Sequence, residues 1–152
     1  MYSAVDQRGT LLREAVGWRP YVTGDIGLIK ARAVDDFDHD MFEECGEAWT
    51  LWEEHRPVAI FGIAPVDEGV GMFWGVVSDD ARGRGVRWIR RRMTFVQRWL
   101  MQQMNVYRRL QTTIRLDREY QRFIELLGFQ NEGLMRKIAA DGGDLWLYSR
   151  VD

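Results

Sequence analysis

The sequence predicts a single α/β domain: a mixed, mostly antiparallel sheet of six or seven strands with helices on both faces. The chain has 152 residues, of which 46% are hydrophobic, which is enough for one well-packed core. Short apolar runs typical of strands alternate with two segments of helical periodicity. No Pro-, Gly- or Ser-rich linker divides the chain, so these elements are expected to pack in layers. We predict an N-terminal extension over residues 1–25 and the folded domain over residues 26–152.

The N-terminal half is expected to hold one strand, one helix and then three consecutive strands. Alternating apolar residues over 26–33 predict the first strand. Two aspartates then offer an N-cap for an acidic helix over residues 36–46. Apolar runs at residues 48–54, 58–64 and 71–78, separated by turn residues, predict three strands that pair as an antiparallel meander.

The C-terminal half begins with the longest predicted helix, over residues 86–104. Its apolar face is formed by Ile89, Met93, Val96, Leu100 and Met104, and is widened by Trp88, Phe95 and Trp99. A strand over residues 110–114 and a shorter helix over 118–127 follow. Strands over 132–138 and 145–150, joined by a glycine-rich turn, complete the sheet.

Charge is strongly segregated along the chain, although the net charge is only −2. Residues 1–81 carry six Lys or Arg against sixteen Asp or Glu, whereas residues 82–122 carry twelve Arg against two acids. The planar guanidinium fork suits phosphate. The basic segment is therefore expected to face an anion, or the acidic part of this chain or of a neighbour. A solvated basic helix is the alternative.

Composition also bears on location. Cys45 is the only cysteine, which excludes an internal disulfide and fits a reducing compartment. The first residues lack the basic and apolar regions of a secretory signal, and no run of about 18 apolar residues predicts a membrane span. We expect a cytoplasmic protein.

The chemically most informative segment joins the strand at 71–78 to the long helix. Such a turn presents backbone N–H groups at a helix N-terminus, where hydrogen bonds and the helix dipole can hold a pyrophosphate. Gly83 and Gly85 allow a ligand to approach the backbone, and Arg82 and Arg84 add positive charge.

From residue 26 to 151 the chain resembles the GNAT superfamily of acetyl-CoA-dependent N-acetyltransferases. The resemblance rests on the Arg-Gly-Arg-Gly turn after Val77, the helix that follows, and Phe-Ile-Glu-Leu-Leu-Gly-Phe at 123–129 ahead of Glu132-Gly133. It implies acetyl-CoA as cofactor, no metal, and direct attack of an amine on the thioester. The cofactor-binding residues that it implies are Val76, Val77, Arg82, Gly83, Arg84, Gly85, Val86 and Arg87.

Several positions depart from the superfamily pattern. Arg87 stands where the pattern has Gly or Ala, and Ile124 stands where it has the tyrosine that protonates the leaving thiolate. The catalytic residues are therefore unknown. Glu54 and Tyr120 are the candidates for base and acid. The other nearby groups are Glu53, His55 and Tyr148.

A narrower resemblance is to small GNAT-like virion and morphogenesis proteins of short-tailed phages. It rests on Phe73-Trp74, on residues 121–129 and on the hairpin that ends in Tyr148. It implies a virion-associated or assembly protein with protein partners or self-assembly, weak or lost activity, and a location in the bacterial host or virion. Two alternatives remain: an active N-acetyltransferase, and a nucleic-acid-binding module that uses the twelve arginines of residues 82–122.

Overall fold

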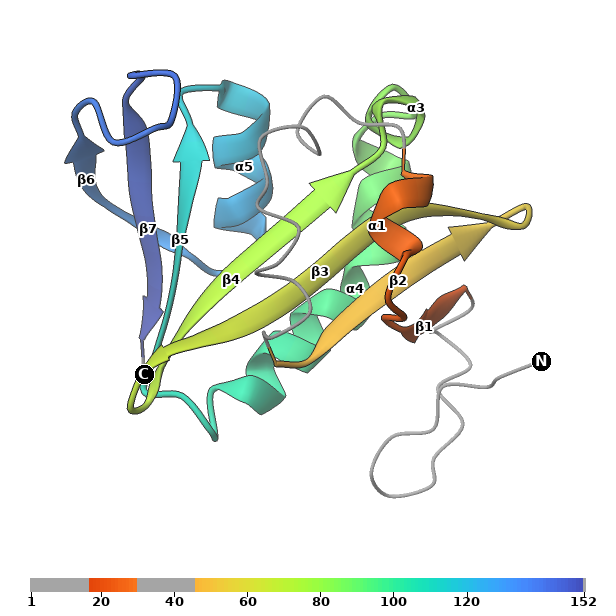
Figure 1. Cartoon of the computed structure of the whole chain (residues 1–152), viewed down its shortest axis with the longest axis horizontal. Coiled ribbons are helices and arrows are strands. Elements are labelled where there is room, and N and C mark those ends of the chain that lie inside the picture. The colour runs from red at the N-terminus through yellow and green to blue at the C-terminus, as the bar shows by residue number, and fades with distance from the viewer. Residues whose placement is uncertain (1–16, 30–45, 152) are drawn as a thin grey trace. The chain divides into compact units, whose positions relative to one another are not determined.

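The computed structural model describes residues 17–29 and 46–151. Their seven strands form one sheet in the order β1-β2-β3-β4-β5-β7-β6 (Figure 1). The residues group into two compact units: one holds the described residues up to Ile63 together with Trp74–Val96, and the other holds Ala64–Phe73 and the described residues from Gln97 onward. The predicted α/β class, with a mixed and mostly antiparallel sheet, is confirmed.

The first unit is built on the strands β1 (Trp18–Pro20), β2 (Ala48–Glu53), β3 (Arg56–Asp67) and the end of β4 (Val70–Val77). β2 pairs antiparallel with both β1 and β3. The apolar run predicted as a central strand lies in β3, where residues 57–64 are all buried. The strands expected at 48–54, 58–64 and 71–78 are thus present, and β3 extends three residues further than predicted.

The strand predicted over residues 26–33 is wrong where the structure describes it, because residues 25–28 form the short helix α1 (Asp25–Leu28). Gly24 enters the turn with φ 102°, and the Asp25 carboxylate accepts hydrogen bonds from the Val22 N–H (3.0 Å) and the Thr50 hydroxyl (2.8 Å). Ile26 and Ile29 are buried at a spacing of three, which suits a helical turn. Residues 30–33, the predicted acidic helix at 36–46 and Cys45 lie outside the described residues.

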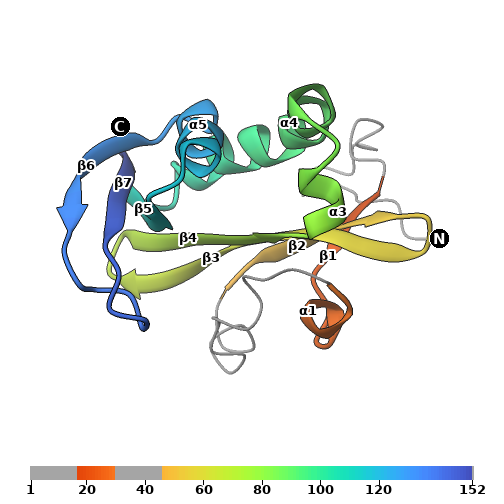
Figure 2. The same cartoon turned by 90° about the horizontal axis from the view of Figure 1, so that it is seen from above.

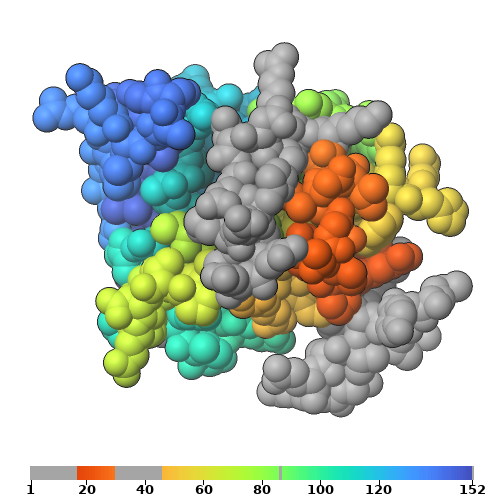
Figure 3. All heavy atoms as spheres, in the orientation of Figure 1, coloured from red at the N-terminus to blue at the C-terminus, as the bar shows by residue number. Residues whose placement is uncertain are grey.

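Helix α1 and the first turns of α4 (Val86–Gln103) lie on opposite faces of strands β1–β3 (Figure 2). The space-filling view shows α1, in orange, against the yellow end of the β2–β3 hairpin (Figure 3). Helices on both faces were predicted, and this arrangement confirms them. In the first unit the inward side of α4 is formed by Met93, Phe95 and Val96, all buried.

Trp18 anchors β1 to this unit. Its side chain is 2% exposed, its ring stacks on Phe95 at 5.1 Å, and its indole N–H donates to the Arg92 carbonyl at 3.3 Å. Strand β1 was not predicted, because three residues are too few for a period-two pattern to be visible. Residues 18–20, placed in the N-terminal extension on sequence grounds, therefore pair with a strand of the sheet.

The second unit contains β5 (Arg109–Arg115), α5 (Arg118–Leu126), β6 (Gln130–Met135) and β7 (Leu145–Val151). β7 pairs antiparallel with β5 and with β6, and the start of β4 pairs in parallel with β5. All four elements were predicted. Gly128, just after α5, has φ 87°, the left-handed conformation that commonly ends a helix. Among the described helices none is long and apolar enough to cross a bilayer.

An ion pair in this unit makes stability depend on pH. The Arg109 guanidinium binds both oxygens of Glu132, with Nη1–Oε1 at 2.9 Å. Hydrogen bonding from Arg109, then from Ser149, lowers the pKa of Glu132 to about 2. A carboxyl group with a lowered pKa stabilises the fold above its ordinary pKa of about 4.5, and this contribution disappears as the pH falls towards 2.

We therefore predict that Glu132→Gln lowers the free energy of unfolding at pH 7, by about 1 kcal/mol or less because solvent screens this partly exposed pair. The gap between E132Q and the wild type should close as the pH falls from 4.5 to 2, measured by urea unfolding across that range. The difference in unfolding free energy between Arg109→Gln and the wild type should shrink over the same pH range. A gap that stays constant with pH would show that the ion pair does not set the acid sensitivity.

Candidate functional site

The turn between β4 and α4, residues 78–87, is held in place by Ser78 and the short helix α3 (Asp79–Arg82). The Ser78 N–H donates to the Val58 carbonyl of β3 at 2.9 Å, so the turn starts from a fixed point at the edge of β4. The Ser78 hydroxyl accepts from the Ala81 N–H at 3.1 Å and caps α3. We call residues 78–87 the β4–α4 turn.

Gly85 reverses the chain from α3 into α4. It has φ 88°, which glycine adopts without strain, and among the described residues no heavy atom other than those of its chain neighbours lies within 4 Å of the position that a Cβ would take. The first-turn N–H groups of an α-helix have no acceptor within the helix, and they carry the positive end of its dipole. The first turn of α4 contains no acidic residue. Backbone donors next to open space are what an anion requires.

The residues predicted to bind the cofactor fall into two groups. Val76 is 2% exposed, so its side chain belongs to the core and only its backbone could meet a ligand. Val77 is half-buried. The second group consists of six consecutive residues of the β4–α4 turn: Arg82, Gly83, Arg84, Gly85, Val86 and Arg87. Binding of a cofactor by either group stays a prediction.

Arg84 does not simply add free charge to the turn, as the sequence suggested. Its Nη1 binds Glu53 Oε2 and its Nη2 binds Asp80 Oδ2 at 2.9 Å. The second oxygen of Glu53 accepts from Arg92 Nε at 2.9 Å. The hydrogen bonds from Arg84 to Asp80 and then to Glu53 raise the pKa of the guanidinium above its ordinary value. Some arginines of the basic segment, residues 82–122, are therefore paired with carboxylates of the acidic segment, residues 1–81, of the same chain.

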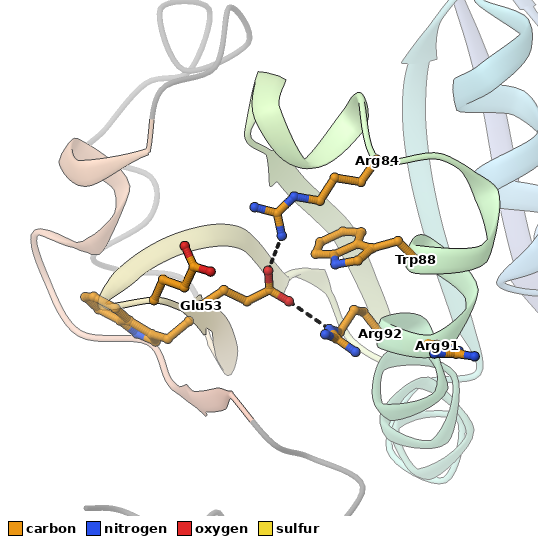
Figure 4. Close-up of a pocket in the computed structure, with 7 residues that line it drawn as sticks. Glu53, Arg84, Trp88, Arg91 and Arg92 are labelled. Atoms are coloured by element: carbon orange, nitrogen blue, oxygen red, sulfur yellow. Dashed lines mark hydrogen bonds and ion pairs between the residues drawn. The ribbon is translucent and has the colours of Figure 1, made fainter.

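Trp88 lies between the two arginines that Glu53 binds (Figure 4). Its ring centroid is 5.3 Å from Arg84 Cζ and 5.6 Å from Arg92 Cζ, distances at which a guanidinium is attracted to an indole ring. Trp88 was expected on the apolar face of the helix; it is instead half-exposed, because it stacks with these charges. We call Glu53, Arg84, Trp88 and Arg92 the Glu53 cluster.

A hollow of about 620 Å³ opens beside the Glu53 cluster. It lies between the end of the β2–β3 hairpin and the first turns of α4. Arg91, an exposed residue of α4, is part of its lining. The hollow is lined by Trp52, Glu53, Glu54, Arg84, Trp88, Arg91 and Arg92.

The candidates for catalysis lie in different units. Glu54 is exposed at the β2–β3 turn, where Glu54 and His55 have positive φ values of 48° and 66°, and it faces the hollow. Tyr120 is half-buried in α5 of the second unit. The roles of Glu54 and Tyr120 stay predictions.

Ile124, which stands at the position of the superfamily's acid, and Tyr148, a further candidate for that acid, are both buried in the second unit. Ile124 is 4% exposed in the core of the second unit. The Tyr148 hydroxyl is buried, donates to Glu125 Oε1 at 3.2 Å and accepts from Gln121 Nε2 at 3.3 Å. Tyr148 therefore has a structural explanation.

Sequence reasoning missed Glu53 as the centre of a cluster, together with Trp88 and Arg92. Trp88 and Arg92 are four residues apart on α4, so a shared face could have been expected. Nothing in the sequence pairs them with a glutamate 39 residues from Arg92. Within the described ranges, no three His, Cys, Asp or Glu side chains are grouped so as to hold a metal ion.

Solved structures with the same architecture identify the fold. A candidate phosphinothricin N-acetyltransferase matches with a TM-score of 0.66 and 18% identity, over 88% of this chain and 96% of that one. The chain has the GNAT acetyltransferase fold. The spermidine/spermine N-acetyltransferase SpeG of Vibrio cholerae shares this GNAT fold, with a TM-score of 0.63 and 12% identity over 88% and 91% of the two chains.

A third GNAT structure contains the cofactor. RimL, a ribosomal L7/L12 α-N-protein acetyltransferase in complex with coenzyme A, matches with a TM-score of 0.55 and 13% identity, over 69% of this chain and 61% of RimL. No protein-family model and no curated protein matches the sequence. At these identities the likeness concerns the fold, and the resemblance to phage virion proteins stays a prediction.

Proposed function

We propose that this protein binds acetyl-CoA through the β4–α4 turn and transfers its acetyl group to an amine. The observation that carries the proposal is Gly85: a residue with φ 88° and open space at its Cβ position, directly before the first turn of an 18-residue helix. A phosphate group can approach the backbone there and meet N–H groups that the helix leaves unpaired. The GNAT fold adds the expectation that this anion is the pyrophosphate of coenzyme A.

Direct acetyl transfer requires side chains mainly to position the two reactants. Acetyl-CoA would supply an activated acyl thioester. A neutral amine that is held beside the thioester can attack it without a covalent enzyme intermediate, and orientation alone contributes much to such reactions. The C–N bond would form as the C–S bond breaks, and coenzyme A would leave as a thiolate that takes a proton from solvent. Glu54, an exposed carboxylate that lines the hollow, would accept the proton that the amine must lose. The acceptor is an amine of unidentified class.

Calorimetric titration with acetyl-CoA tests the proposal. We expect a Kd of about 100 μM or tighter, which corresponds to about 5.5 kcal/mol. Desulfo-CoA should bind comparably, because the pyrophosphate and not the thioester would carry the affinity. A screen of amine acceptors would follow. Absence of binding at millimolar acetyl-CoA would refute the proposal.

A virion-associated or assembly role with lost catalysis is the second candidate. Two observations favour it: Arg84 is already paired with two carboxylates, and Ile124 stands buried where the superfamily has a tyrosine acid. Lack of acetyl-CoA binding, together with a self-associated state in sedimentation, would support this role instead. The nucleic-acid alternative would require binding that weakens steeply with salt.

A further inference from the structure

The Glu53 cluster has the form of an anion site whose anion belongs to the protein. One carboxylate joins two guanidinium groups, with a different oxygen bound to each: Arg84 at Oε2 and Arg92 at Oε1. A phosphate presents the same kind of oxygens to arginine pairs, with equal or greater charge. The side chain of Glu53 is 16% exposed, whereas that of Arg84 is 31% exposed. The glutamate is therefore the more enclosed partner and the arginine the more accessible one.

Arg84 is the member of this network that can leave at little cost. Glu53 would keep its bond to Arg92, at 2.9 Å. Asp80 would keep its bond to Arg56, at 2.8 Å. Departure of Arg84 thus leaves neither carboxylate without a cation, so the penalty of an unpaired charge does not arise. Withdrawal of Arg92 would likewise leave Glu53 with one cation, so what distinguishes Arg84 is its position directly before Gly85.

The position of Arg84 would bring a released guanidinium close to a ligand at the turn. It immediately precedes Gly85, within the β4–α4 turn, and its guanidinium also lines the 620 Å³ hollow with Arg91. A long side chain on a surface turn can reorient while its backbone stays in place. The same residue therefore belongs both to the Glu53 cluster and to the predicted anion site.

We propose that Glu53 is a built-in competitor that holds the Arg84 guanidinium, and that a phosphate-bearing ligand at the β4–α4 turn draws this guanidinium from Glu53 to itself. The inference rests on the proposed function for the identity of the ligand, acetyl-CoA. We call the Glu53–Arg84 ion pair, together with its opening by a ligand, the clasp; the clasp requires only a pyrophosphate group. Glu53 is a positioning residue in this scheme, because it acts through Arg84. Ligand affinity is then set partly by how strongly Glu53 retains Arg84.

Removing the competitor should strengthen binding. We expect Glu53→Gln to lower the Kd for acetyl-CoA by about three- to tenfold, by calorimetry. Glu54→Gln removes the same charge from the adjacent, exposed position, and should change the Kd by less than about twofold. Glu53→Asp keeps the charge but is too short to join both arginines, so it should also tighten binding. These ion pairs are partly exposed, and thermal melts of all three variants should stay within about 4 °C of the wild type.

The decisive comparison is made in the background of Arg84→Gln. There the acetyl-CoA Kd should rise by about tenfold, and adding E53Q should no longer lower it, because Arg84, the guanidinium that the ligand would take from Glu53, is absent. The inference is overturned if E53Q still tightens binding without Arg84, or if E53Q and E54Q tighten it equally.

Inorganic pyrophosphate, titrated into the same variants, separates this inference from the proposed function. If the wild type fails to bind acetyl-CoA but E53Q gains pyrophosphate affinity that depends on Arg84, the acetyltransferase proposal fails and the clasp stands. If acetyl-CoA binds and E53Q gives no gain, the clasp fails and the proposed function stands. If neither the wild type nor E53Q binds either probe, both are refuted.

Discussion

Replacing Gly85 by valine is expected to lower the affinity for acetyl-CoA by at least about tenfold, measured by calorimetric titration. Valine would place its methyl groups in the open space that adjoins the first turn of α4, where the pyrophosphate must approach the backbone. It would also force a β-branched residue into a φ of 88°, at a cost of about 1–2 kcal/mol in stability.

Gly142 provides the matched control. It lies in the connection between β6 and β7 and has φ 81°. In the described part of the chain, no heavy atom beyond those of its two neighbours lies within 4 Å of its Cβ position. Gly142→Val should therefore impose similar backbone strain, and a similar loss of unfolding free energy, while the Kd for acetyl-CoA stays within about twofold of the wild type. Equal affinities for G85V and G142V would show that the β4–α4 turn is not the binding site.

Truncating Trp18 to alanine should lower the free energy of unfolding by about 3–5 kcal/mol, measured in urea. The indole is 2% exposed, packs on Phe95 and lies 6.0 Å from the ring of Phe61, so its loss leaves a large cavity between β1, β3 and α4. The indole N–H bond to the Arg92 carbonyl would be lost as well. The effect would be large for a residue that the sequence assigned to an extension.

Two further variants check the explanation. Trp18→Phe keeps an aromatic ring against Phe95 and should recover more than half of the loss. Arg19→Ala changes the next residue, which is exposed and contacts only the Trp52 ring among its described interactions (5.4 Å), and should cost about 1 kcal/mol or less. A loss below about 1 kcal/mol for W18A would mean that β1 is peripheral to the fold.

Most of the elements could be predicted because their signals are local. The α4 face repeats every three or four residues, β3 is an unbroken apolar run, and Gly128 supplies the conformation that ends α5. The Gly85 turn could be predicted for the same reason, since a glycine between a strand and a long helix is visible in the order of residues. The errors of this kind are short elements: β1, and the four-residue helices α1 and α3.

The short elements could not be predicted because their stability comes from distant partners. Helix α1 depends on the Asp25 carboxylate, which meets the Thr50 hydroxyl across 25 residues of sequence. Strand β1 depends on pairing with β2 and on the burial of Trp18. Neither partner can be read from a window of neighbouring residues, so an alternating pattern at 26–33 was interpreted as a strand.

By itself, the sequence determined the order of the strands and long helices from residue 48 onward, the place of the glycine turn and the separation of acidic from basic segments, since composition, periodicity and glycine conformation act over a few residues. Only the tertiary structure decided which charges meet. Glu53 and Arg84 are 31 residues apart, and they join because β2 ends beside the start of α4. An ion pair depends on distance in space and not along the chain. The same arginine that the sequence offered to a phosphate is therefore first bound to two carboxylates of its own chain.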